Sequence, residues 1–358
     1  MIVVRAPSNI ALIKYMGKLT TPEAKGLNIP ENSSLSMTLH DLCTFAEAVW
    51  EPGASADIAW LPESPRLAAL PRHARVPRLD AAGTEKVARH ARRVLAAAPE
   101  FLARLGVAPR RGVSAGLVLR TANTFPEASG IASSASAFAA LTLAVTAAAA
   151  EDSAAFARAY EAAGVGARRA LAGLARQGSG SACRSFEGPF VEWQQTETRT
   201  VPSELPKLAH FVLVVSDGAK QVSSSEAHLK VKTSPLWQGR IERAEAKLVD
   251  VRRALAAGDL KSLAWITWRE AWEMHSLFHT CEEPFTYWEP TTIQVLKKLA
   301  PTLHESHPPI VTLDAGPNIH VIVEADRAAE WKVRFARDFA GLGLLEDRPG
   351  AGAELIGF

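Results

Sequence analysis

One stretch decides how the first half of this chain folds: Pro126-Glu127-Ala128-Ser129-Gly130-Ile131-Ala132-Ser133-Ser134-Ala135. Before it, residues 113–119 alternate in the manner of a β-strand. Within it begins an alanine-rich run without charges, residues 128–150, which is typical of a buried helix packed closely against its neighbours. The sequence therefore predicts a strand, a glycine and serine loop, and then a long helix.

The loop at 126–135 has the composition of a phosphate-binding site. A helix start offers unpaired backbone N–H groups and a positive dipole end, glycine lets the backbone approach an anion, and serine hydroxyls add donors. The loop lacks both the Gly-Lys-Ser/Thr ending of a Walker A motif and the spaced glycines of a dinucleotide fingerprint. Taken alone, it leaves two interpretations open, a phosphate loop or an ordinary tight helix start.

Composition narrows the class of protein. At 358 residues the chain is long for one hydrophobic core, and its 47% hydrophobic and 22% charged residues are ordinary for a globular protein. The formal net charge of +2 gives no general reason to expect a nucleic-acid or membrane-surface partner. The run at 128–150 is long enough to span a bilayer, but alanine and serine dominate it, so we interpret it as a buried helix.

Cysteine usage and the N-terminus favour a cytoplasmic protein. Cys43, Cys183 and Cys281 are far apart and form no C-x-x-C pair, which argues against a disulfide framework or a zinc ribbon. The first residues lack the basic region and long apolar core of a signal peptide. We therefore expect a cytoplasmic location.

The sequence pattern restarts near Leu208, where residues 210–215 form an apolar run suited to a strand buried on both faces. We predict an α+β protein of two domains, residues 1–204 and 205–358. The first domain is predicted to have strands at 2–4, 35–39 and 188–193, a turn at Pro7-Ser8-Asn9, a loop with a short hairpin at 51–82, and helices at 84–98 and 153–174. The second is predicted to have helices at 236–257, 260–279 and 326–340 and strands at 310–313 and 319–324.

A basic stretch covers residues 66–111, with eleven Lys or Arg against three Asp or Glu. Arg89, Arg92 and Arg93 lie on the predicted helix at 84–98. Such a stretch is either a solvated face or a rim that attracts an anionic substrate.

Three other segments add charged groups to the loop at 126–135: two are cationic, and the third offers a single carboxylate. Arg176-Gln177-Gly178-Ser179-Gly180-Ser181-Ala182-Cys183-Arg184-Ser185 is a glycine and serine turn with arginines near both ends, and guanidinium groups grip carboxylate or phosphate. Lys14-Tyr15-Met16-Gly17-Lys18 places two cations four residues apart. Asp314-Ala315-Gly316-Pro317-Asn318 offers one carboxylate, although an Asp before Gly-Pro is also a common turn former. Together they describe a site for a polyanionic substrate and a metal–nucleotide.

These motifs, with three further segments, resemble the diphosphomevalonate decarboxylases, a family of the GHMP kinase superfamily. The matching stretches run in order over nearly the whole chain: 6–18, 27–36, 125–135, 176–185, 214–217, 284–287 and 314–318. The Asp-Ala-Gly-Pro-Asn run is the most telling, because simple kinases of the superfamily usually have a glycine-richer segment there. The chain departs from the family at Met16, where Trp is common, and at Leu19-Thr20, where Arg-Asp is usual. These departures leave the fit around the phosphate tail of the substrate open.

The resemblance implies a two-domain GHMP kinase fold, with a ribosomal S5 domain 2-like N-terminal domain and a ferredoxin-like C-terminal domain. It implies ATP-dependent decarboxylation of mevalonate 5-diphosphate to isopentenyl diphosphate, with Mg²⁺ as the metal cofactor and a homodimer as the usual assembly. Decarboxylation of the monophosphate, or a mevalonate-type kinase without decarboxylation, are the alternatives. A non-catalytic nucleotide sensor is the alternative from another class.

The resemblance also assigns roles to residues. Asp314 matches the catalytic aspartate beside the 3-hydroxyl, Lys14 the cation near the transferred phosphate, and Arg184 the group that holds the substrate carboxylate. Phosphoryl transfer depends mostly on positioning and charge neutralisation, which agrees with these residue types. The substrate contacts implied are Tyr15, Lys18, Ser179, Ser181 and Arg184. The nucleotide contacts implied are Ser129, Gly130, Ser133, Ser134 and Lys220, and no protein metal ligand is implied.

Two other patterns are interpreted as structural. His275 and His279 lie four residues apart beside Glu273, but the H-E-x-x-H arrangement is absent, so we expect a histidine that packs or supports the site from behind. Trp265, Trp268 and Trp272 recur at helical spacing, as core residues do.

Overall fold

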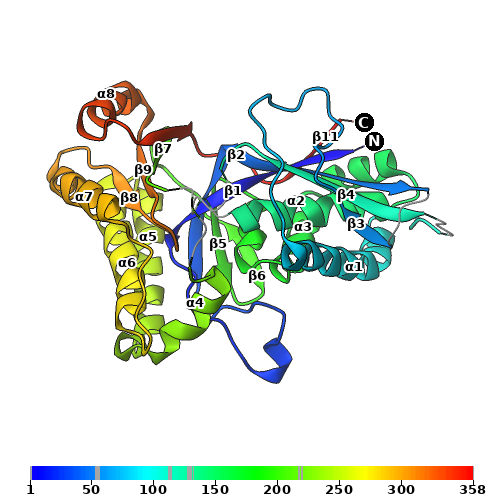
Figure 1. Ribbon diagram of the computed structural model, residues 1–358, viewed down its shortest axis with the longest axis horizontal. Helices are drawn as coiled ribbons and strands as arrows, with labels where there is room; N and C mark the ends of the chain where they lie inside the picture. The colour runs from blue at the N-terminus through cyan, green and yellow to red at the C-terminus, as the bar shows by residue number, and fades with distance from the viewer. Residues whose placement is uncertain are drawn as a thin grey trace.

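The computed structural model describes residues 2–52, 57–111, 115–126, 131, 133–216, 218 and 221–357. These residues form two β-sheets with helices packed against them (Figure 1). Within this described part, the first sheet has seven strands in the order β11-β1-β2-β4-β3, with β5 paired to β2 and β6 paired to β5. Its strands are β1 (Val3–Ile13), β2 (Ser34–Glu51), β3 (Ile58–Trp60), β4 (Gly116–Asn123), β5 (Phe190–Gln194), β6 (Glu197–Thr200) and β11 (Glu354–Ile356).

Three long helices cover the first sheet: α1 (Ala81–Arg104), α2 (Ser133–Ala149) and α3 (Ser153–Arg176). The central one, α2, packs against β1 and β2 and against both other helices. Its small side chains are buried on almost every side, which explains why the charge-free run in the sequence is a core helix. Among the described residues, no helix has the length and apolar character needed to cross a bilayer.

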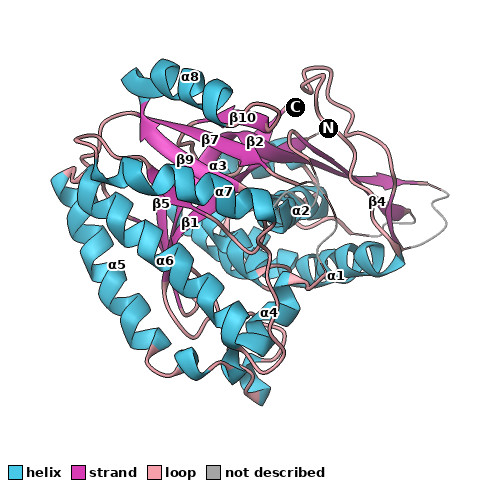
Figure 2. Cartoon of the chain, turned by 60° about the vertical axis from the view of Figure 1, so that its left-hand side comes forward, coloured by secondary structure: helices cyan, strands magenta, loops and turns pink. Residues whose placement is uncertain are grey.

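The second sheet is antiparallel, in the order β10-β7-β9-β8. Its strands are β7 (Leu208–Val214), β8 (Ile310–Thr312), β9 (Ile319–Glu324) and β10 (Gly343–Asp347). The helices around it are α4 (Ser224–Lys230), α5 (Arg240–Ala257), α6 (Leu260–Thr280), α7 (Pro290–Leu299) and α8 (Ala328–Asp338). Figure 2 shows α5 and α6 side by side, with α8 at the opposite side of the sheet.

Strand β7 is buried on both faces, as predicted from its continuous apolar sequence. Val212 belongs to a core shared with α5 and α6, whereas Phe211 belongs to a core with α7 and α8. The first of these cores also contains Ile10 and Leu35 of the first sheet. The two sheets are therefore joined by one continuous apolar core, and a cavity opens beside this junction.

Most predicted helices and strands are confirmed, but the turn expected at Pro7-Ser8-Asn9 is wrong. These residues lie inside β1, where the register against β2 shifts between Pro7 and Asn9. A bulge of this kind tolerates proline, which has no N–H for the ladder. The hairpin expected within 51–82 is also not found among the described residues, where β3 instead pairs parallel with β4.

The last strand returns to the first sheet, because β11 pairs antiparallel with β1. The division of the chain at residues 204 and 205 stays a prediction.

Candidate active site

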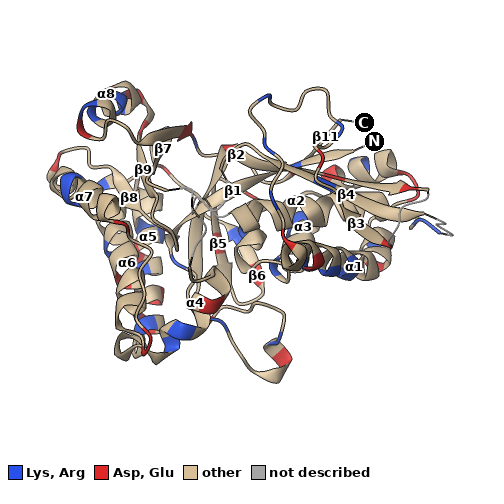
Figure 3. Ribbon diagram, viewed as in Figure 1, with Lys and Arg blue, Asp and Glu red and all other residues tan. Residues whose placement is uncertain are grey.

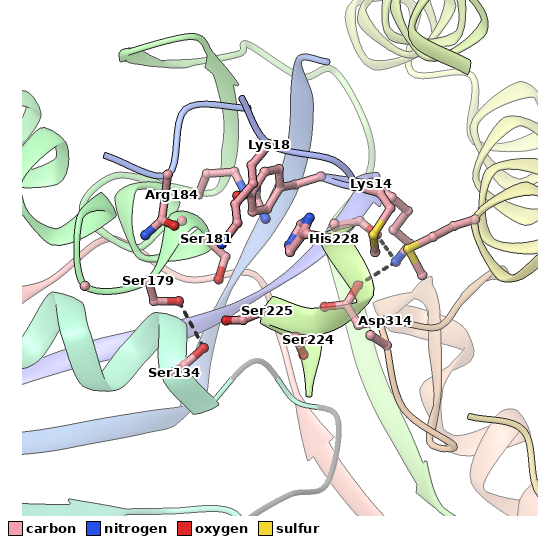
Figure 4. A pocket seen from close by; sticks show the side chains of 18 of the residues that line it. Lys14, Lys18, Ser134, Ser179, Ser181, Arg184, Ser224, Ser225, His228 and Asp314 are labelled. Carbon is pink, nitrogen blue, oxygen red and sulfur yellow. Dashed lines mark hydrogen bonds and ion pairs between the residues drawn. The ribbon is translucent and has the colours of Figure 1, made fainter. Parts of the chain in front are cut away.

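A cavity at the junction of the two sheets brings together the segments that the sequence singled out (Figure 4). It is lined by the loop after β1, the start of α2, the turn that follows α3, helix α4 and the loop after β8. Lys14, Tyr15, Lys18, Ser134, Ser179, Ser181, Arg184 and Asp314, all predicted from the sequence as site residues, line this cavity.

Lys14 and Asp314 form an ion pair at one end of the cavity. The Lys14 Nζ atom lies 2.7 Å from Asp314 Oδ1 and also donates to the Ala11 carbonyl at 2.7 Å. Burial lowers the pKa of Lys14, although Asp314 opposes the shift. Asp314 itself is 23% exposed, so its carboxylate is held by the lysine yet open to the cavity.

A buried charge network holds Lys14 from behind. The Lys14 backbone N–H donates to Glu270 Oε1 at 3.1 Å. Glu270 is also paired with Arg240 and Lys247, and the Arg240 and Glu270 side chains are both fully buried. Although burial favours the neutral carboxyl, Arg240 keeps the pKa of Glu270 below its usual range. Helix α6 thereby fixes the end of β1 through a hydrogen bond to a charged group.

Arg184 is buried on the opposite side of the cavity with neutral partners. Its Nε atom donates to Ser36 Oγ at 2.9 Å and its Nη1 atom to Ser34 Oγ at 2.5 Å. Its guanidinium lies 5.5 Å from the centre of the Trp193 ring. Burial lowers the pKa of Arg184, and it forms no ion pair with any carboxylate in the described part of the chain. A desolvated cation of this kind favours an incoming anion.

Two further cations approach the cavity without a described carboxylate partner. Lys18 is partly buried, and burial and the charge of Lys232 lower its pKa. Lys86, on α1, lies 4.9 Å from the centre of the Phe138 ring, and burial and the charge of Lys18 lower its pKa. With Lys14 and Arg184, they set four positive charges against the single carboxylate of Asp314 among the described residues that line the cavity. The electrostatics therefore favour a polyanion.

The start of α2 meets the turn at 178–181 on the cavity wall. Ser134 Oγ lies 3.0 Å from Ser179 Oγ. Ser133 is the first residue of α2. Ser129, Gly130 and Lys220, which the sequence also predicted as nucleotide contacts, lie outside the described residues.

Family models match both halves of the chain. A model of the diphosphomevalonate decarboxylase-like N-terminal domain matches residues 6–203, and one of the mevalonate 5-diphosphate decarboxylase C-terminal domain matches residues 210–344. The chain belongs to the diphosphomevalonate decarboxylase family.

Individual relatives agree with this family. Diphosphomevalonate decarboxylase of Saccharomyces cerevisiae is 31% identical over 332 residues, which cover 88% of this chain and 76% of the yeast protein. The crystal structure of a mevalonate diphosphate decarboxylase from Legionella pneumophila is 32% identical, with a TM-score of 0.73 over 96% of this chain and 99% of that one. A structure of MDDEF in complex with MVAPP, AMPPCP and magnesium is 27% identical, with a TM-score of 0.78 over 100% and 99% of the two chains. The predicted two-domain GHMP kinase fold is confirmed by these structures.

Within this decarboxylase-family site, sequence reasoning missed several residues that line the cavity. They are Asn28, Lys86, Ser224, Ser225, His228 and Met274. Lys86 had a partial signal, since it lies in the basic stretch at 66–111, and Figure 3 shows basic residues along α1. Both interpretations of that stretch apply to part of it. Lys86 lines the cavity, whereas Arg92 lies on a solvated face and pairs with the exposed Glu85.

Arg176, at the other end of the predicted anion-binding turn, does not line the cavity. It is buried, and its Nη1 atom donates to the Gln195 carbonyl at 3.1 Å. The arginines at the two ends of the turn therefore differ, and Arg184 alone of the two lines the cavity.

His275 supports the site from behind, as the sequence predicted. Its Nε2 atom lies 3.2 Å from the Asp314 carbonyl oxygen, and its ring stacks on Trp288 with centroids 4.8 Å apart. Burial lowers the pKa of His275 to about 3, so the ring is neutral. Glu273 instead pairs with Arg243 and Lys247, and does not join His275 at a common point.

Proposed function

We propose that this chain catalyses the ATP-dependent decarboxylation of mevalonate 5-diphosphate to isopentenyl diphosphate, with release of ADP, phosphate and CO₂. One observation carries the proposal. The Lys14–Asp314 pair and the carboxylate-free Arg184 line one cavity, so a single bound substrate meets a carboxylate for its hydroxyl and a cation for its carboxylate. Phosphorylation of the hydroxyl needs the first of these groups for its chemistry, whereas decarboxylation also needs the substrate carboxylate to be oriented.

Asp314 is the group that acts on the 3-hydroxyl. An alcohol is a weak nucleophile, and a carboxylate that accepts its proton or orients it contributes roughly 10²–10⁴-fold in rate. Lys14 holds Asp314 in place at 2.7 Å and supplies positive charge beside the transferred phosphoryl group. Once positive charge develops at C3, the same carboxylate stabilises it.

Arg184 is the group that holds the carboxylate of the substrate. Its hydrogen bonds to Ser34 and Ser36 fix the plane of the guanidinium. Because serine hydroxyls are neutral, the positive charge stays available to the substrate. The substrate carboxylate must leave as CO₂. The guanidinium, held by the two serines, orients this carboxylate as a single cation, without a second cation pairing with it.

The remaining substrate contacts are Tyr15, Lys18, Ser179 and Ser181, which face the diphosphate tail. Lys18 is the cation among them, and it has no described carboxylate partner. Ser181 lies in the short helical turn that also carries Arg184, and Ser179 directly precedes it, so one segment binds both ends of the substrate.

The start of α2 is the nucleotide side, with Ser133 and Ser134 in the described part and Ser129, Gly130 and Lys220 outside it. The Ser134 and Ser179 hydroxyls lie 3.0 Å apart there, and Lys86 lines the same cavity, which fits a chain of phosphates. Mg-ATP, when bound, supplies the phosphoryl group that makes the 3-hydroxyl a leaving group. The MDDEF structure that holds AMPPCP and magnesium supports this cofactor pair.

The test supplies mevalonate, its 5-phosphate and its 5-diphosphate separately with Mg-ATP, and measures ADP and CO₂. We expect both products from the diphosphate. ADP without CO₂ would show a kinase, both products from the monophosphate alone would show the alternative decarboxylase, and neither product would show a nucleotide sensor.

We also propose a cytoplasmic homodimer. Cys43, Cys183 and Cys281 are all free and buried, which suits a reducing compartment. Size-exclusion chromatography with light scattering tests the assembly, and a mass of 38.5 kDa would show a monomer.

A further inference from the structure

His228, on helix α4, is a cavity-lining residue that the reaction described above leaves without a role. It is 8% exposed, and Figure 4 shows its ring between Ser181 and Lys18 on one side and Lys14 and Asp314 on the other. Its helix is anchored by Ala227 and Val231, which pack into an apolar cluster with α6. The ring therefore has a fixed position between the proposed reaction centre and the proposed tail site.

A backbone hydrogen bond determines which ring nitrogen of His228 carries the proton. The Gly17 N–H donates to His228 Nδ1 at 3.0 Å. A backbone amide can only donate, so Nδ1 must accept and cannot be protonated. The imidazole is therefore neutral, with its hydrogen on Nε2.

Gly17, whose N–H makes this hydrogen bond, stands at a position that only glycine fits. Its φ of +85° lies in the left-handed region that favours glycine, and an added Cβ would lie 2.2 Å from a ring carbon of Trp237. On the other side, the ring of His228 packs on that of Tyr15, with centroids 4.2 Å apart. The imidazole is held by the Gly17 N–H at its Nδ1 atom and by the Tyr15 ring against its face.

The Nε2–H group has no partner within the described part of the chain. Among the described residues, the bond from Gly17 is the one hydrogen bond made by a ring nitrogen of His228. The Nε2 atom has no such bond and is not one of the fully buried unpaired polar atoms, so it is accessible. Since His228 lines the cavity, this N–H is open to it. A donor held in this way is suited to an anionic oxygen of a ligand.

The charges around His228 indicate which part of the ligand it meets. Burial, with the charges of Lys18 and Lys232, lowers the pKa of His228 to about 3. Lys18 is the cation proposed for the phosphate tail. A neutral donor adds a hydrogen bond beside these lysines without adding a third positive charge.

We infer that His228 is a substrate-binding residue whose Nε2–H donates to a phosphoryl oxygen of the substrate's phosphate tail. This inference rests on the proposed function, because the tail is that of mevalonate 5-diphosphate. It adds a donor that the sequence motifs did not indicate and that lies on the C-terminal half of the chain.

Two substitutions at position 228 distinguish the contributions of the two ring nitrogens. His228→Asn keeps an acceptor near the Nδ1 position for Gly17 but has no donor that reaches the Nε2 position, whereas His228→Gln keeps an amide donor near that position. For His228→Asn we expect the dissociation constant for mevalonate 5-diphosphate, measured by calorimetry without ATP, to rise about tenfold or more. KM should rise by a similar factor with kcat within about threefold, because the contact is the same in the ground and transition states. His228→Gln should lose less affinity than His228→Asn.

The matched control is His279→Asn, which changes a partly exposed histidine of α6 that bonds to Thr286 and does not line the cavity. It should leave both constants unchanged. If His228→Asn binds substrate within twofold of the wild type, or His228→Gln is the weaker binder, the inference is overturned. The second outcome would mean that His228 acts by holding Gly17.

A measurement on the wild type covers the case in which a variant does not fold. In ¹⁵N-histidine-labelled protein, the His228 Nε2–H resonance should report the Nε2-protonated ring and should shift on saturation with mevalonate 5-diphosphate. No shift on saturation would overturn the inference. If the wild type binds this substrate but releases no CO₂, the proposed function fails. The dissociation constants of the His228 variants, which are measured without ATP, still decide whether His228 binds the phosphate tail.

Discussion

Arg184 and Arg240 are both buried, yet their surroundings differ in charge. Arg240 forms a paired hydrogen-bonded contact with the fully buried Glu270. Although burial opposes its charge, Glu270 outweighs the burial and raises the pKa of Arg240. Among the described residues, the partners of the Arg184 guanidinium are two serine hydroxyls and an aromatic ring, and burial lowers its pKa.

The difference separates a structural cation from a binding one. Taking a guanidinium out of water is costly, and Arg240 offsets that cost with a carboxylate of its own chain. Arg184 leaves the cost uncompensated until an anion arrives. We therefore propose that Arg240 serves the stability of the fold and that Arg184 serves the substrate, and each proposal can be tested separately.

The largest effect should follow Arg184→Met. Loss of a bidentate, charged contact to the substrate carboxylate should lower kcat/KM by about 10³-fold or more. The free energy of unfolding should change little, because the variant removes a buried charge that has no carboxylate partner in the described protein. Steady-state kinetics and urea unfolding measure the two quantities. A stability loss as large as that of Arg240→Met would erase the distinction between the arginines.

Asp314→Asn should come next, with kcat reduced roughly 10²–10⁴-fold and the dissociation constants for ATP and substrate nearly unchanged. Asp314 is the carboxylate whose charge reaches Arg184 across the cavity, but it is bound to Lys14. The variant therefore tests whether Asp314 acts in the chemistry or only balances the cations. Near-normal turnover would contradict its assignment to the hydroxyl.

Arg240→Met should mainly lower stability, by about 3–5 kcal/mol, because Glu270 would remain buried without this partner. The double variant Arg240→Met/Glu270→Met should recover much of that loss, because both charges are then gone. Urea unfolding of the two single variants and the double variant gives the coupling energy. Single-variant losses that simply add would show that the pair contributes no such coupling.

The fold was largely predictable because its long helices and buried strands have strong local patterns. The β7 strand was predicted from its continuous apolar run, and the α3 helix was predicted over residues 153–174. The turn signal of Pro7-Ser8-Asn9 misled because pairing of β1 with β2 overrides local preference. The pairing of β11 with β1 joins residues more than 300 positions apart, and no local pattern records it.

The candidate site was predictable for residues that belong to a sequence motif. Lys14, Arg184 and Asp314 are such residues, and all three line one cavity. His228 could not be found in this way, since a histidine in a short polar helix has no distinctive spacing. Its role depends on a bond from Gly17, which is 211 positions away in the chain. Glu270 is similar, because its contact with the Lys14 backbone exists only once α6 packs beside β1.

The smallest expected effect is a shift in the pH dependence of the reaction through Lys14. The charges of Arg184 and of Glu270, the partner of Arg240, both act on the pKa of this lysine. Burial lowers the pKa of Lys14, while Asp314 and Glu270 oppose that shift. If the reaction needs the charged lysine, kcat/KM should fall as pH rises through the Lys14 pKa, at a pH below the 10.5 of an ordinary lysine. Glu270→Gln removes one opposing negative charge and should move this alkaline limb to still lower pH. The measurement is kcat/KM against pH, limited to conditions where circular dichroism shows an unchanged fold. A limb that stays in place would mean that Glu270 acts on Lys14 only through its backbone hydrogen bond, and that the charge of the Arg240 network does not reach the active site.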